Sequence, residues 1–106
     1  MMEKPECKGI IRSVLPAVRA SVATTMHDKY GYSQERIAKE LGVVQVAVSK
    51  YLRNRYSAQI HRMKSYILQN KLNDSIVSKI LKGEGRQQID GAIDELCDRL
   101  VAINPV

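Results

Sequence analysis

The chain has 106 residues and a net charge of +6, and 44% of its residues are hydrophobic although Phe and Trp are absent. This length is enough for one small domain, and no apolar run approaches the roughly 18 residues of a membrane-spanning helix. The first residues lack the apolar segment of a secretory signal, so we expect a cytoplasmic protein with no membrane partner. Only 6 Gly and 3 Pro interrupt long stretches of 3.6-residue periodicity, which predicts an all-α fold of five or six helices.

The N-terminal part is predicted to hold a flexible leader, residues 1–9, and a first helix at about Ala17–Lys29. Apolar residues between 10 and 30 recur every three or four positions, but Pro16 interrupts the pattern. Proline is tolerated in the first turn of a helix and disfavoured inside one. We therefore expect residues 10–15 to form a separate turn or the upper half of a kinked helix.

Residues 32–52, with the sequence YSQERIAKELGVVQVAVSKYL, are the most informative segment. Their apolar positions do not fall on one face of a single helix. They fit two short helices, about Gln34–Leu41 and Gln45–Arg53, with Gly42 at the corner and the small Ala38 at the closest approach. This layout predicts a helix-turn-helix whose second helix enters the major groove of DNA.

Two further helices are predicted at about Ala58–Gln69 and Asp74–Lys82. Residues 50–82 contain eight basic residues and one acidic residue, so this stretch carries +7. Beside a helix-turn-helix, such a basic excess favours phosphate binding over a merely solvated surface.

The last predicted helix, about Arg86–Ile103, carries an apolar seam with coiled-coil spacing. We interpret this seam as a homodimer interface, because a two-fold DNA site requires a two-fold protein. The alternative is a helix that packs onto its own domain. The chain then divides into the leader (1–9), a DNA-binding domain (10–83) and a C-terminal dimerisation helix (84–106). The seam consists of Ile89, Ile93, Leu96, Leu100 and Ile103.

The segment 34–52 resembles the helix-turn-helix of lambda-repressor-like, xenobiotic-response-element-type transcriptional regulators. The segment 14–52 is similar, more narrowly, to small archaeal regulators, some of which carry a thiamine-phosphate-synthase-like domain that this chain is too short to contain. The resemblance implies that Gln34 lies near a DNA phosphate and close to Gln45, the first candidate for base recognition. The residues that carry it are Gln34, Ile37, Ala38, Leu41, Gly42, Val43, Gln45, Val48, Ser49, Tyr51 and Leu52.

The exposed face of the second helix supplies the side chains expected to contact DNA. The Gln45 amide can pair with adenine in two hydrogen bonds, and Val46 can contact a thymine methyl. Val44 stands where the family usually has a capping Ser or Thr, which costs about 1 kcal/mol of helix-start stability and leaves a methyl contact in place of a hydroxyl. Arg62 and Lys64 are weaker candidates. The predicted DNA-binding residues are Gln34, Val44, Gln45, Val46, Ser49, Lys50, Arg53, Arg55 and Tyr56.

No motif predicts an enzyme, a cofactor, a metal or a small-molecule ligand. P-loop, nucleophile-elbow and zinc-protease patterns are absent from the sequence. Cys7 and Cys97 lie near opposite ends of the chain and form no C-x-x-C pair, so buried or idle thiols are expected, with a disulfide between them as the alternative.

The function expected from these features is that of a transcriptional regulator, a repressor that binds double-stranded DNA sequence-specifically as a homodimer. Two alternatives remain. One is a nucleoid-type protein that binds DNA without sequence preference, and the other is an antitoxin-like adaptor that binds a protein partner.

Overall fold

The computed structural model describes the backbone of residues 5–103 and the side chains of residues 12–103, and this range contains helices and no strand. The all-α prediction with six helices is confirmed. The helices are α1 (Pro5–Asp28), α2 (Gln34–Leu41), α3 (Gln45–Leu52), α4 (Ala58–Gln69), α5 (Asp74–Leu81) and α6 (Arg86–Ile103).

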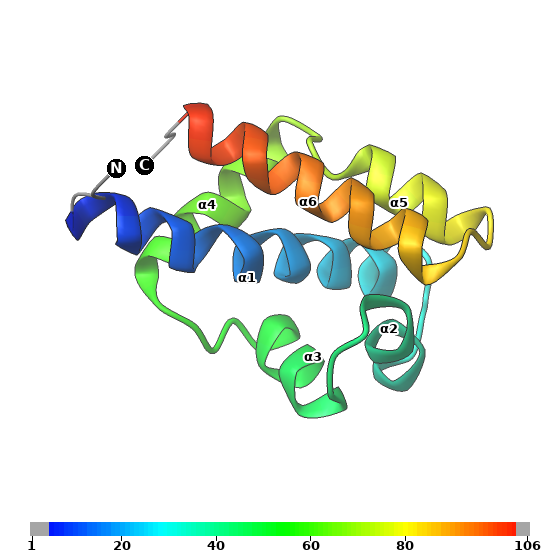
Figure 1. Ribbon diagram of the computed structural model, residues 1–106. Helices are drawn as coiled ribbons and strands as arrows, with labels where there is room; N and C mark the ends of the chain where they lie inside the picture. Colours follow the sequence, from blue (N-terminus) through cyan, green and yellow to red (C-terminus); the bar gives the residue numbers. More distant parts are fainter. Residues whose placement is uncertain (1–4, 104–106) are drawn as a thin grey trace.

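The long helix α1 forms the centre of the fold and contacts all five other helices. In Figure 1, α5 and α6 lie above α1, and α2 and α3 lie below it. The helix α3 is therefore separated from the α5–α6 pair by α1, whereas α2 also contacts α6. This arrangement leaves the outer side of α3 uncovered by the rest of the described chain.

The helix α1 is continuous through Pro16, so the predicted start at Ala17 is wrong. An interior proline costs about 3 kcal/mol because it removes one backbone hydrogen bond. Val14 and Val18, on either side of it, are 2% and 0% exposed. Burial of each such side chain contributes about 1.5–3 kcal/mol, which offsets that cost. Residues 5–9 of the predicted leader are also helical, and residues 1–4 lie outside the described range.

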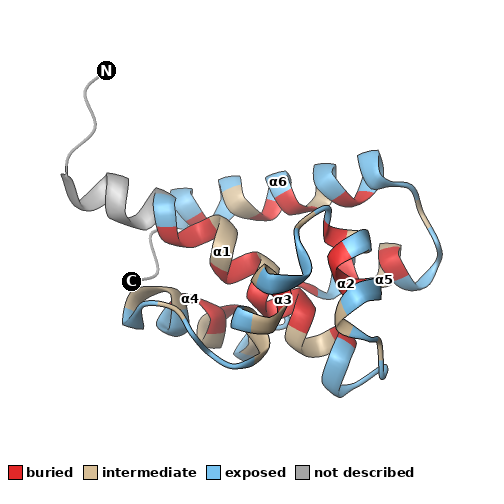
Figure 2. Cartoon of the chain, turned by 90° about the horizontal axis from the view of Figure 1, so that it is seen from below, coloured by how far each residue is buried: buried red, intermediate tan, exposed pale blue. Residues whose placement is uncertain are grey.

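The core is built from aliphatic side chains of all six helices, with Met26 and Met63 fully buried among them. Figure 2 shows the buried residues on the sides of the helices that face one another, with exposed residues on the outer sides. No described helix combines the length and the hydropathy needed to cross a membrane.

The apolar seam of α6 packs into this same core, which corrects the prediction of a dimer interface. Four of its five residues are at most 4% exposed within one chain and have no surface to offer a second one. These residues are Ile89, Ile93, Leu96 and Leu100. Only Ile103, at the end of the helix, is exposed, at 53%.

Candidate nucleic-acid interface

The corner between α2 and α3 is formed by Gly42, whose φ of +69° lies in the left-handed region. The backbone N–H groups of Gly42 and Val43 both donate to the carbonyl of Ala38, which closes the C-terminal end of α2. At the start of the same helix, the Ser33 hydroxyl accepts a hydrogen bond from the Arg36 backbone N–H at 3.1 Å. The helix therefore has a defined cap at each end.

Arg86, the first residue of α6, covers this corner. Its Nη2 donates to the Lys39 carbonyl oxygen at 2.8 Å, and its guanidinium occupies the place that a Cβ at Gly42 would need. Gly42 is favoured by its backbone angle, and a Cβ at this position would displace the Arg86 guanidinium. The contact connects the helix-turn-helix to α6, and the sequence pattern did not predict it.

The two helices share a buried wedge, as the sequence predicted. Ile37, Ala38 and Leu41 of α2 and Val48 of α3 are all buried, and Ala38 is 6% exposed at the crossing. Burying Val48 fixes the rotation of α3. By the 3.6-residue period, Val46 and Lys50 lie opposite Val48 and point outward. Gln45 is exposed in the first turn of α3.

The outer side of α3 carries most of the predicted contact residues. Gln45, Lys50 and Arg53 are exposed, and Ser49 is half-buried. Val44 and Val46 are exposed large hydrophobic residues, at 70% and 64%. The structure thus brings polar, cationic and methyl-bearing side chains together on one uncovered surface, which we call the α3 surface (residues 44–46, 49, 50 and 53).

Val44 has the extended backbone of an N-cap residue, but no side-chain hydrogen bond caps α3. Valine in place of the usual Ser or Thr therefore leaves the start of α3 without the hydrogen bond that a capping hydroxyl would accept. Gln34 is half-buried at the start of α2, and no hydrogen bond joins it to Gln45 in the described part of the chain. The closeness of Gln34 to Gln45 that the resemblance implies stays a prediction.

The loop after α3 is held by a buried lysine that the sequence did not identify as structural. Lys64 is 6% exposed, and its Nζ donates to Asn54 Oδ1 at 3.1 Å and to Tyr56 Oη at 2.9 Å. The Tyr56 hydroxyl in turn donates to Asn54 Oδ1 at 2.6 Å. Lys64 is therefore not a surface contact, and the hydroxyl of Tyr56, one of the predicted DNA-binding residues, bonds within the chain.

Asn54 itself has a φ of +57°, a left-handed conformation that asparagine adopts more readily than most residues. The Arg55 backbone N–H donates to the Lys50 carbonyl at 2.9 Å, which ties the loop to the end of α3. Arg53 and Arg55 are exposed on this loop. The left-handed conformation could have been predicted from the asparagine at position 54. No signal in the sequence indicated that Lys64 of α4 is its partner.

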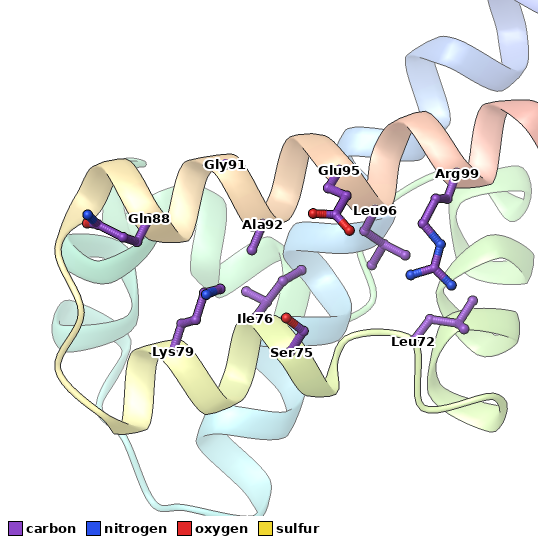
Figure 3. Close-up of a pocket in the computed structure, with 10 residues that line it drawn as sticks. All are labelled: Leu72, Ser75, Ile76, Lys79, Gln88, Gly91, Ala92, Glu95, Leu96 and Arg99. Atoms are coloured by element: carbon purple, nitrogen blue, oxygen red, sulfur yellow. The ribbon is translucent and has the colours of Figure 1, made fainter.

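A shallow groove of about 340 Å³ lies between α5 and α6, away from the α3 surface (Figure 3). Its apolar part includes Leu72, Ile76 and Leu96, and the Glu95 and Arg99 side chains lie along it. No group of His, Cys, Asp and Glu within the described residues is suited to hold a metal. The groove shares no residue with the α3 surface.

Cys97 is a free thiol whose surroundings favour its protonated form. Burial raises its pKa from 9.0 to about 11, the negative charges of Asp94 and Asp98 add to this effect, and Arg19 opposes it. The Cys7 side chain lies outside the described side chains, and because Cys97 is free, the alternative of a disulfide between the two is not what the structure has.

Comparison of the chain with protein-family models, curated proteins and solved structures gave no match. The function is therefore inferred from the residues and geometry of this chain.

Proposed function

We propose that the protein is a transcriptional regulator that binds double-stranded DNA sequence-specifically, with α3 in the major groove. The observation that carries this proposal is the orientation of α3, which buries Val48 and exposes Gln45, Val46 and Lys50 on one side. A helix whose exposed side combines an amide, a methyl group and a cation offers the chemistry of base edges and phosphates together.

The dimensions of α3 support the proposal. Its 8 residues correspond to about 12 Å of helix, similar to the width of the major groove. Because α1 separates α3 from α5 and α6, the rest of the described chain does not obstruct a duplex placed against the α3 surface (Figure 1).

Basic residues on the same side supply the expected phosphate contacts. Arg53 and Arg55 follow the exposed side of α3 directly, and both are exposed. Phosphate contacts of this kind fix the register of a recognition helix without carrying sequence information.

We further propose that two copies bind a two-fold site, since one short helix contacts only a few base pairs. The buried seam of α6 is not available for this contact. The second copy must therefore use a surface outside that seam, such as the exposed end of α6 at Val101 and Ile103.

One competing function is favoured by a specific observation. The +7 charge of residues 50–82 suits a nucleoid-type protein that binds all duplexes alike. No comparable observation supports the other alternative, an antitoxin-like adaptor that binds a protein partner.

Selection of bound duplexes from a random DNA pool by the purified protein tests the proposal. We expect enrichment of a defined motif with two-fold symmetry. Retention of DNA without enrichment of any motif would favour the nucleoid-type function, and failure to retain DNA at low salt would overturn both.

A further inference from the structure

Lys64 carries a buried positive charge that has no negative partner among the described side chains. The Lys64 side chain is almost fully buried, and its two hydrogen-bond acceptors, on Asn54 and Tyr56, are both neutral. The ion pairs found among residues 12–103 involve His27 with Asp28 and Lys79 with Glu84, and none involves Lys64. Buried charges are normally paired, because burial of an isolated one is unfavourable.

The Asn54 side chain, which contacts Lys64, also presents a hydrogen-bond donor to solvent. Asn54 Oδ1 accepts from both Lys64 and Tyr56, so the amide nitrogen on the other branch of the side chain is directed away from them. Asn54 is exposed, and its Nδ2 donates no hydrogen bond within the described chain. The neighbouring Arg55 is exposed and forms no ion pair among the described residues.

We propose that Asn54, Arg55 and Lys64 form a binding site for one phosphodiester group of the DNA backbone. Asn54 and Arg55 donate to the phosphate oxygens, and Lys64 supplies its charge from behind through a medium of low dielectric constant. This site deepens the proposed function and rests on it. A phosphodiester is the fitting anion because the loop continues directly from α3, and phosphates line the edges of the groove that α3 would occupy.

The first test is the substitution Asn54→Asp, assayed for thermal unfolding and for duplex binding. Aspartate tolerates the left-handed backbone and gives Lys64 a carboxylate partner, so the melting temperature should be equal or higher. The same carboxylate repels the phosphate, so the dissociation constant should rise about tenfold or more. A purely structural role for the Lys64 network predicts no more weakening than one added negative charge causes by itself, so the comparison with a matched control variant distinguishes the two roles.

The matched control is Ser75→Asp, which adds the same charge to an exposed residue of α5, on the other side of α1 from α3 (Figure 1). Its dissociation constant should change much less. Equal weakening by Asn54→Asp and Ser75→Asp would overturn the site.

A second variant, Lys64→Met, removes the charge and keeps a long side chain. The slope of log Kd against log salt concentration should become shallower by about one phosphate contact. Lys82→Met, which removes an exposed lysine at the end of α5, should leave the slope nearly unchanged. Equal slopes for the two lysine variants would overturn the site while the proposed function stands, whereas a wild-type chain that binds no duplex would overturn both.

Discussion

The side chains of the α3 surface are expected to divide the binding free energy between base recognition and phosphate contact. Gln45→Ala removes an amide that can form two hydrogen bonds to adenine, so we expect discrimination between the selected site and random duplex to fall by about 1–3 kcal/mol. Competition titration at one fixed salt concentration measures this difference. Equal loss on both duplexes would show that Gln45 does not contact a base.

Arg53→Ala, at the end of the same helix, is the comparison for Gln45→Ala. Its side chain is exposed just beyond α3, and it should weaken binding to all sequences evenly and reduce the salt slope by about one. A selective loss on the preferred site would instead give Arg53 a base-recognition role.

Cys97 gives a prediction about pH. Its pKa of about 11 in the folded chain, against 9.0 without the burial, means that the unfolded chain releases the proton at lower pH. The Cys97 contribution to the free energy of unfolding is therefore complete below pH 9 and is lost as the pH rises from 9 to about 11. In a Cys7→Ser background, thiol alkylation should have its midpoint near pH 11 when folded and near 9 in denaturant. A folded midpoint near 9 would contradict this burial.

The sequence identified residues whose positions depend on their immediate neighbours. It missed residues whose positions depend on contacts with distant parts of the chain. Val46 and Lys50 follow from the local helical pattern, because they lie opposite Val48, which is buried. Lys64 does not, because its two partners lie ten and eight residues away across a loop. A lysine in a basic stretch looks like a surface residue until its position on α4 is known.

At the scale of the elements, the corner at Gly42 gives the sharpest prediction. Gly42→Ala should destabilise the fold by about 1–2 kcal/mol, because alanine disfavours the left-handed backbone. The loss should exceed this value because the Arg86 guanidinium must also move away from the new Cβ. Gly31→Ala is the control, since Gly31 has a φ of +71° but open space around a Cβ. Chemical denaturation should show a larger loss at Gly42 than at Gly31. Combining Gly42→Ala with Arg86→Ala should bring the loss at Gly42 close to that at Gly31, and equal losses in the single variants would contradict the contact.

The helix α6 is predicted to act as part of the core. Leu100 is 0% exposed, so Leu100→Ala should lower the free energy of unfolding by about 2–5 kcal/mol. The loss should be the same at low and high protein concentration. A variant that keeps its stability but shifts from dimer to monomer in sedimentation would restore the seam as an interface.

The boundaries of α2 to α6 follow closely from apolar spacing and capping residues, whereas α1 does not. Pro16 marks a helix start by local rules, and only the burial of residues on both sides of it explains the continuous helix. The seam of α6 had the same limitation. Its spacing predicts burial correctly, but spacing alone does not say whether the covering surface belongs to the same chain.

At the scale of the whole molecule, the fold separates two surfaces by the thickness of α1. The α3 surface is polar, basic and methyl-bearing, and the α5–α6 groove combines apolar side chains with polar and charged ones, Glu95 and Arg99 among them (Figures 1 and 3). DNA on the α3 surface leaves the groove free. Mapping where DNA contacts the chain therefore examines the orientation of α3 and the proposed function together.

The most direct measurement is a titration of isotope-labelled protein with a duplex from the selection, followed by backbone amide shifts. We predict that the largest shifts fall within residues 44–56, with smaller ones at Gln34, and that α5 is unaffected. Shifts concentrated around the α5–α6 groove, or none at saturating DNA, would contradict a DNA interface on α3.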